Sequence, residues 1–201
     1  MAETPDETPK PEKLPTFFKA LDPDEITKFK IAYYDAISAF EMLVFGIITS
    51  IMQAFMQAGL KNSQMANAVV AHQTAEPLTK TWYSTFYSLV ENDPAMVVHL
   101  KSIRKALLKA LEQRNIYAHT VFWGSLNVDI ANTGLLTLLL RHGSQGVVPL
   151  SKNVRTCDLV EFKSECDAAA SAIAHFAASF EHPELKAALE QAMKRLNQNK
   201  P

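Results

Sequence analysis

The sequence predicts a mainly all-α protein: a bundle of four to five helices with a small antiparallel β-meander inserted before the penultimate helix. Three observations predict this class. Apolar residues recur at three- and four-residue steps over long stretches of the 201 residues, as on the buried face of a helix. Only 6 glycines are present, which is few for the many turns of a β-sandwich or barrel. The 48% hydrophobic and 20% charged composition indicates a globular domain.

The first twenty residues differ from the rest of the chain. They begin MAETPDETPKPEKLP, which is rich in proline and acidic residues and has no apolar core of a secretory signal. Such a segment buries too little apolar surface to order itself. We therefore expect a disordered tail over residues 1–20 and a single helical domain over residues 21–197.

The first helix is expected from about Pro23 to Ala58. Asp22 can cap it, and Pro23 suits the first helical position. After Glu41 a second apolar stripe joins the first, so the later half is apolar nearly all round. Such a helix lies at the centre of a bundle or is shared between the core and a subunit contact. The apolar run 42–56 is shorter than the ~20 residues of a membrane span, so no membrane association is expected.

Two further helical segments follow. Residues 60–74 are weakly helical, and Pro77 interrupts or restarts the helix before residues 78–90. The next helix has the clearest signals, because Asp93 can cap it and Pro94 occupies its first turn. It is expected to end near residue 118. Its core stripe comprises Leu100, Ile103, Leu107 and Leu111.

The predicted meander covers about residues 122–150. Apolar and polar residues alternate over 126–130, as in a half-buried strand. Residues 135–140 and 147–148 are the further strand candidates, separated by turns at 132–134 and 142–146. The penultimate helix should begin near Thr156 or Asp158, since Asp158 and Glu161 have capping-box spacing. Pro183 starts a last helix that ends near Asn197.

The most informative residues lie at the end of the helix that begins at Pro94. This helix is the third if residues 60–90 are counted as one interrupted helix. Extending its apolar stripe by three and four residues reaches Arg114 and Asn115, and one further turn reaches His119. An inward-facing charge costs several kcal/mol unless it is paired. A carboxylate such as that of Glu41, a subunit interface or an anionic ligand could offset this cost. The alternatives are that Arg114 only interacts with the helix dipole, that His119 only caps the helix, and that Glu41 faces solvent.

The arrangement Arg114-Asn115-x-x-x-His119 at the end of the third helix resembles the RNxxxH signature of the HEPN superfamily. The similarity in helical order extends over about residues 23–180. The resemblance implies a homodimer in which two copies of the motif meet in a cleft. It also implies a metal-independent endoribonuclease, often a toxin with a cognate antitoxin protein, or a non-catalytic dimeric module that binds nucleotide, RNA or protein.

The chemistry of these side chains fits RNA cleavage without a metal. RNA carries its own nucleophile, the 2′-hydroxyl, which can attack the adjacent phosphate. His119 would move the proton near neutral pH, and Arg114 would stabilise the charge that develops on the phosphate. Asn115 would position the phosphate or orient His119. DNA, which lacks the 2′-hydroxyl, should resist.

Four further residues are candidates for substrate binding. Lys101, Lys105 and Lys109 lie four residues apart on one helix face and could contact phosphates, although a solvated face is the favoured explanation. Tyr117 could stack an extruded base, but packing within the protein is the favoured alternative. A net charge of −1 gives no overall basic character.

Other classes of site have weaker support in the sequence. The histidines and two cysteines form no spacing typical of zinc ligands, and no phosphate-binding glycine loop is present. We therefore expect no metal and no cofactor. The two cysteines cannot build a disulfide scaffold, which favours a cytoplasmic location.

Overall fold

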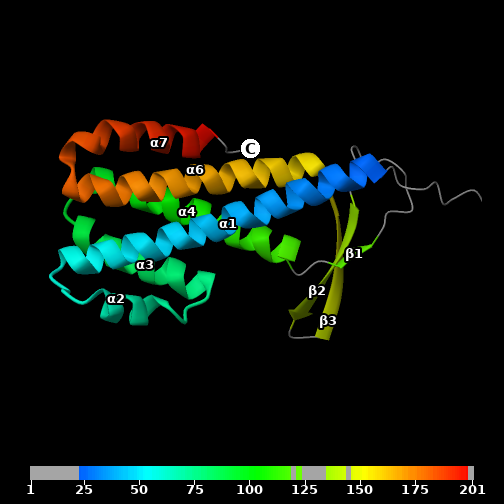
Figure 1. The fold of residues 1–201 in the computed structure, drawn as a ribbon, viewed down its shortest axis with the longest axis horizontal. Helices are drawn as coiled ribbons and strands as arrows, with labels where there is room; N and C mark the ends of the chain where they lie inside the picture. Colours follow the sequence, from blue (N-terminus) through cyan, green and yellow to red (C-terminus); the bar gives the residue numbers. More distant parts are fainter. Residues whose placement is uncertain (1–22, 119–120, 124–134, 144–145, 199–201) are drawn as a thin grey trace, which may run out of the picture.

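The computed structural model describes residues 23–118, 121–123, 135–143 and 146–198, with side chains over 23–118 and 154–198 (Figure 1). Six α-helices form the main body. They are α1 Pro23–Gln57, α2 Ser63–Val70, α3 Ala75–Val90, α4 Pro94–Ala118, α6 Thr156–Glu181 and α7 Lys186–Gln198. A short 3-10 turn, η1 Pro183–Leu185, precedes α7.

The long helices lie side by side, with α1, α3 and α6 running one way and α4 and α7 the other (Figure 1). Paired contacts fix these directions. Along α1 and α6, Phe40 stacks on Phe162 and Gln57 hydrogen-bonds Glu181 farther on, so these helices are parallel. Along α4 and α6 the contacts run in opposite order, from Lys109 with Glu165 to Tyr117 with Phe162.

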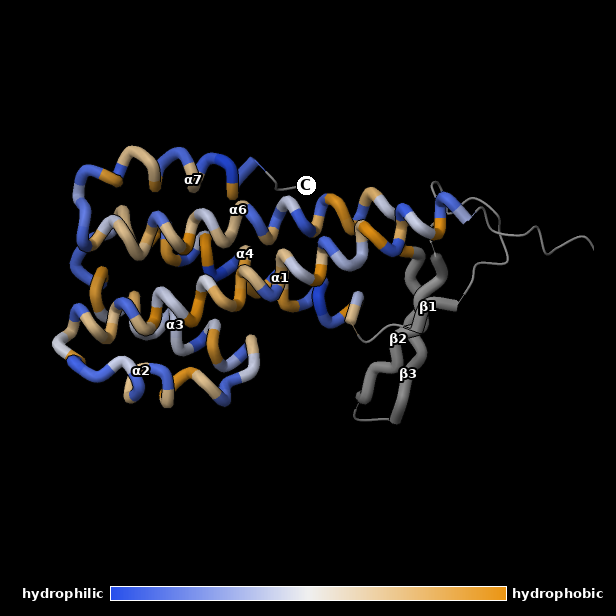
Figure 2. The backbone as a smooth tube through the Cα atoms, viewed as in Figure 1, coloured by the Kyte–Doolittle hydropathy of each residue, from blue (hydrophilic) through white to orange (hydrophobic). Residues whose placement is uncertain are grey.

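An aromatic cluster fills the centre of the bundle. The Trp82 and Phe86 rings of α3 pack against Phe176 of α6, with ring centroids 6.1 and 5.6 Å apart. All three side chains are buried. Apolar stretches alternate with hydrophilic ones along each helix in the way that an amphipathic bundle requires (Figure 2). Burying these rings provides the main favourable free energy of folding.

The fold class expected from the sequence is wrong in the number of helices and in the inserted meander. Helices hold 89% of the residues whose side chains are described, and they number six rather than four or five. The difference arises at residues 60–74, where Asn62 accepts a hydrogen bond from the backbone N–H of Gln64 and caps a separate helix, α2. Pro77 does not interrupt a helix, since it lies in the first turn of α3, where proline is tolerated. The expected β-meander is not supported where side chains are described, because that part of the chain is built almost entirely from helices; the strands that follow α4 are described mainly by their backbone.

The backbone of three strands lies outside this bundle, beside the end of α4 and the start of α6 (Figure 1). They are β1 Val121–Trp123, β2 Leu135–Gly143 and β3 Gly146–Val154, paired antiparallel in the order β1-β2-β3. The third strand is much longer than the expected 147–148, because an edge strand tolerates the proline at position 149. The expected strand at 126–130 lies outside the described residues.

The start of α1 agrees with the expected Pro23, and the expected tail at 1–20 lies outside the described residues. By length and composition alone, α1 is the one helix in the described part of the chain that could cross a membrane. Of its most apolar 18-residue window, 39% is buried inside the bundle. The inward face of α1 is therefore part of the core.

Candidate functional site

The site is built on α4, which brings the Arg114 region next to α1 and α6. The Asp93 carboxylate accepts hydrogen bonds from the backbone N–H groups of Ala95 and Met96, at 3.1 and 3.2 Å, and fixes the start of the helix as expected. The inward stripe then runs through four buried side chains before it reaches the site. They are Leu100, Ile103, Leu107 and Ala110.

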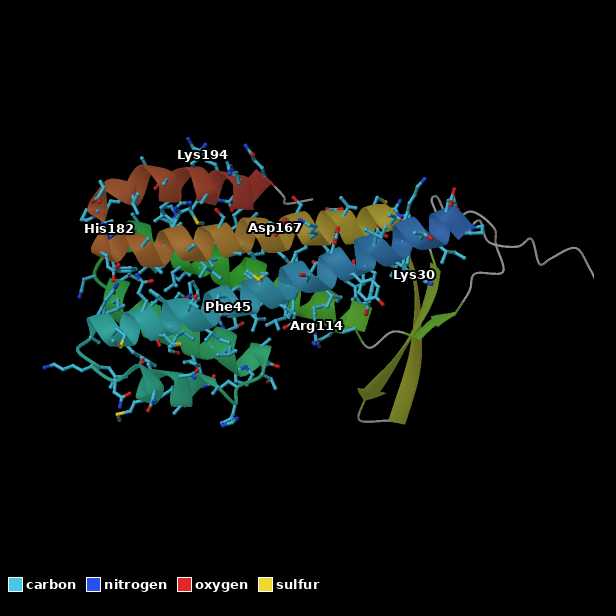
Figure 3. All side chains as sticks on the ribbon, in the orientation of Figure 1. Lys30, Phe45, Arg114, Asp167, His182 and Lys194 are labelled. Atoms are coloured by element: carbon cyan, nitrogen blue, oxygen red, sulfur yellow. The ribbon has the colours of Figure 1, made fainter. Side chains whose placement is uncertain are left out.

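Arg114 continues this stripe and is half-buried near the end of α4 (Figure 3). Its guanidinium carbon lies 5.7 Å from the centroid of the Phe40 ring on α1. Its Nε atom is buried and, within the described part of the chain, has no hydrogen-bond partner. Glu41 is exposed and forms no ion pair with Arg114 among the described residues, so it does not offset this charge. The helix therefore presents a cation that an incoming anion could satisfy.

Gln113 is a residue of this site that the sequence analysis missed. Its Oε1 atom is also buried without a hydrogen-bond partner among the described residues. The stripe passes through Ala110 rather than Leu111, which is only half-buried, and this turns Gln113 and Arg114 toward the interior. A step of three residues from Leu107 reaches Ala110, and a second step of three reaches Gln113. The step of four residues from Leu107 to Leu111 missed it. Counting described residues alone, the site thus holds one unsatisfied acceptor, Gln113 Oε1, beside one unsatisfied donor, Arg114 Nε.

Asn115 does not share the inward position that the sequence predicted for it. Its side chain is exposed, on a different side of α4 from Arg114. The one-residue change in the phase of the stripe accounts for this result, because neighbouring residues of a helix point about 100° apart. His119 lies outside the described residues, so its expected role stays a prediction.

Tyr117 is 2% exposed, and its ring packs edge-on against Phe162 with centroids 5.1 Å apart. Its backbone carbonyl oxygen accepts a hydrogen bond from the Tyr33 hydroxyl, at 3.5 Å. A buried ring cannot stack on a base without leaving the core. The structure thus favours the packing role for Tyr117 over its expected role in substrate binding.

The burial of Tyr117 predicts a loss of stability at high pH. Desolvation, and secondarily the negative charges of Asp158 and Glu165, raise the pKa of Tyr117 from 10.0 to about 12. Since the unfolded chain ionises first, the contribution of Tyr117 is complete below pH 10 and is lost as the pH rises toward 12. We expect the free energy of unfolding of the wild type to fall relative to Tyr117→Phe over this range, by on the order of 2 kcal/mol. Urea titrations at several pH values measure it.

The exposed Tyr87→Phe is the matched control for this experiment. A difference between wild type and Tyr117→Phe that stays constant above pH 10 would contradict the account. It would mean that the Tyr117 hydroxyl reaches water in the folded protein.

The three lysines expected to contact phosphate are not equivalent. Lys109 forms an ion pair with Glu165 at 2.7 Å, and the Glu165 side chain is only 10% exposed. This pair joins α4 to α6, so Lys109 already has a structural partner. Lys101 and Lys105 are exposed, and no ion pair involves them within the described residues. They remain the two candidates for phosphate contact on this face.

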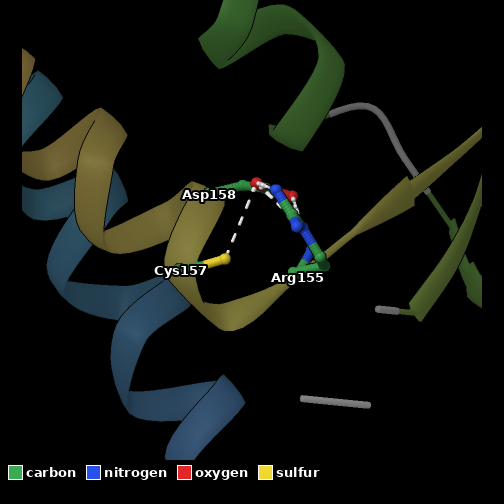
Figure 4. Close-up of polar contacts among 3 residues, drawn as sticks. All are labelled: Arg155, Cys157 and Asp158. Carbon is green, nitrogen blue, oxygen red and sulfur yellow. Dashed lines mark hydrogen bonds and ion pairs between the residues drawn. The ribbon is translucent and has the colours of Figure 1, made fainter. Parts of the chain in front are cut away.

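Arg155, directly before α6, is paired with Asp158 in the first turn of that helix. Its Nη2 atom donates to Asp158 Oδ1 at 2.7 Å, and its backbone N–H donates to Asp158 Oδ2 at 2.9 Å (Figure 4). Asp158 is thus the third residue of α6 and caps it from inside. The Asp158–Glu161 capping box expected from the sequence is wrong by one turn.

A narrow apolar packing gap, too small to hold a water molecule, lies next to the site between α1, α3 and α4. Phe40 and Leu111 line it on the side of Arg114. Elsewhere in the described part of the chain, no group of three or more histidine, cysteine, aspartate or glutamate side chains gathers as it would around a metal. The arrangement can therefore bind an anion through Arg114, and apolar groups border that position.

No protein-family model matches this chain, and neither does any curated protein or solved structure.

Proposed function

We propose that this protein is a HEPN-like, RNA-targeting endoribonuclease that acts without a metal at the end of α4. The proposal includes a cytoplasmic location, a homodimer and an antitoxin protein as a further partner. One observation supports it most strongly. Arg114 is a half-buried cation that has no carboxylate partner and an unsatisfied Nε among the described residues. Such a group is costly to keep unless an anionic ligand completes it.

In this proposal the reaction is an internal transfer. The 2′-oxygen of the RNA forms a bond to the adjacent phosphorus while the bond to the 5′-oxygen breaks. His119 accepts the 2′-hydroxyl proton as general base, and a water molecule donates a proton to the departing 5′-oxygen. Arg114 donates hydrogen bonds to the non-bridging oxygens as their charge grows. The products are a 2′,3′-cyclic phosphate and a 5′-hydroxyl.

The alternative is a non-catalytic dimeric module that binds nucleotide, RNA or a protein. A specific observation favours it: Arg114 and Asn115 point to different sides of α4, so the two described motif residues do not share one pocket. Arg114 would then bind a phosphate without accelerating its transfer.

The test is incubation of the full chain with single-stranded RNA, and with DNA of the same sequence, in excess chelator. We expect cleavage of the RNA alone, with cyclic phosphate ends. RNA that is bound but never cut would support the non-catalytic alternative. Cleavage of both nucleic acids, or cleavage that the chelator stops, would contradict the proposed chemistry.

A further inference from the structure

An apolar face on α1, interrupted by Ser38 and Thr49, faces solvent. The bundle buries one side of this helix, through Ala36, Leu43 and Ile47 among others. The opposite side exposes five large apolar residues over a length of about 37 Å. They are Ile31 at 57%, Tyr34 at 70%, Met42 at 60%, Phe45 at 58% and Met56 at 43% exposure. We call these five residues the α1 face.

The α1 face is large for a surface that stays in water. At roughly 200 Å² for a large apolar residue, the exposed part amounts to about 600 Å² per copy, at the upper limit for monomeric proteins. Two such faces together would bury about 1,200 Å², which is within the range of stable protein interfaces. The face is therefore sufficient for a specific contact.

The pattern of the α1 face is symmetric about a point between Leu43 and Val44. If a second α1 ran antiparallel across that point, Met42 would lie opposite Phe45 and Ile31 would lie opposite Met56. Tyr34 would lie opposite the half-buried Gln53, whose amide could hydrogen-bond the Tyr34 hydroxyl. The two exposed polar positions, Ser38 and Thr49, would also meet each other. A surface that is complementary to itself under a two-fold rotation is what a closed dimer requires.

Gly46, at the edge of the α1 face, also favours a contact with a second helix. A Cβ atom at this position would meet nothing within 4 Å, so packing within one copy does not require glycine. Glycine inside a helix costs about 1 kcal/mol relative to alanine. Its absence of a side chain would let a second helix approach closely.

We infer that the α1 face is the contact surface of a homodimer in which the two α1 helices cross antiparallel midway between Met42 and Phe45. A lipid surface is a poorer occupant, because exposed Asp35 and Glu41 border the middle of the face and would repel anionic headgroups. Phe40, against which Arg114 packs, lies only about 5 Å along α1 from the two-fold point. Because Phe40 is buried on the opposite side of α1, the dimer would hold the two Arg114 sites on the outer sides of the helix pair, about 10 Å apart along it, and this last step rests on the proposed function.

Sedimentation of the full chain at micromolar concentration tests the surface. We expect a dimer for the wild type and a dissociation constant raised at least about tenfold in Phe45→Glu. Val98→Glu is the matched control, since Val98 is 64% exposed on α4 and away from this face. A monomeric wild type, including one whose residues 1–22 cover the face, would overturn the inference, and so would a dimer that Phe45→Glu leaves intact.

Disulfide trapping tests the direction of the two helices. In a Cys157→Ser background, which removes the exposed native cysteine, Ser38→Cys and Thr49→Cys chains should cross-link when mixed and not when either is alone. Cross-linking of Ser38→Cys with itself would indicate parallel helices and contradict the inference. RNA binding measured on Phe45→Glu separates the two proposals, because that variant keeps Arg114.

Discussion

Replacing His119 with alanine is expected to slow RNA cleavage by about 10²–10⁴-fold, the usual contribution of a general acid–base group. Among the residues of the proposed site, only this imidazole would exchange a proton near neutral pH. Alanine removes the imidazole that would carry the proton. Single-turnover cleavage rates in chelator measure the effect, with the free energy of unfolding recorded on the same sample.

His182→Ala is the matched control for this variant. His182 is exposed beyond the end of α6, where its Nδ1 lies 3.1 Å from Glu184 Oε1. We expect its cleavage rate to equal that of the wild type. Equal rates for His119→Ala and wild type would refute the assigned acid–base role.

The second large effect is expected at Phe162, whose ring packs against residues next to Arg114. Phe162 is fully buried in α6 and packs against both Phe40, under the Arg114 guanidinium, and Tyr117. Phe162→Ala should lower the free energy of unfolding by about 3–5 kcal/mol, because it leaves a cavity that three helices cannot close. That is a large part of the 5–15 kcal/mol typical of a whole domain.

Urea unfolding of Phe162→Ala and of the control Val160→Ala measures this difference. Val160 lies two residues earlier in α6 and is 56% exposed, so its loss should change stability by less than about 0.5 kcal/mol. Similar small effects for both variants would mean that the ring stack does not hold α1, α4 and α6 together.

Strong local signals in the sequence identified the long helices. Asp93 and Pro94 placed the start of α4 correctly, and the spacing of Leu100, Ile103 and Leu107 identified its buried face. Burial raises the pKa of the Cys166 thiol to about 12, as expected for a thiol on the buried face of α6. The apolar later half of α1 was correctly explained in part, since one side of it enters the core.

The sequence could not fix details that depend on tertiary packing. Whether the α4 stripe passes through Ala110 or Leu111 is decided by the helices that cover it, and this choice turned Asn115 outward and Gln113 inward. The partner of Lys109, Glu165, lies 56 residues away in the chain. The sequence did not predict the full length of β3, because it contains Pro149. Proline is tolerated in an edge strand, and only the sheet shows that β3 lies at an edge.

The account depends most on Arg114 as an anion-binding cation, and its affinity for a non-cleavable 2′-O-methyl RNA tests this directly. Arg114→Met should bind about 10–100-fold more weakly, as expected for the loss of charge-assisted hydrogen bonds. It should also be at least as stable as the wild type, because an unsatisfied buried Nε costs about 1–3 kcal/mol and the contact with Phe40 returns only about 0.5–1 kcal/mol. Arg104→Met is the matched control, because Arg104 lies on α4 like Arg114 and its exposed guanidinium packs over the Tyr83 ring of α3. This variant should bind nearly as the wild type does. Equal affinity of Arg114→Met and wild type for the RNA would contradict the account.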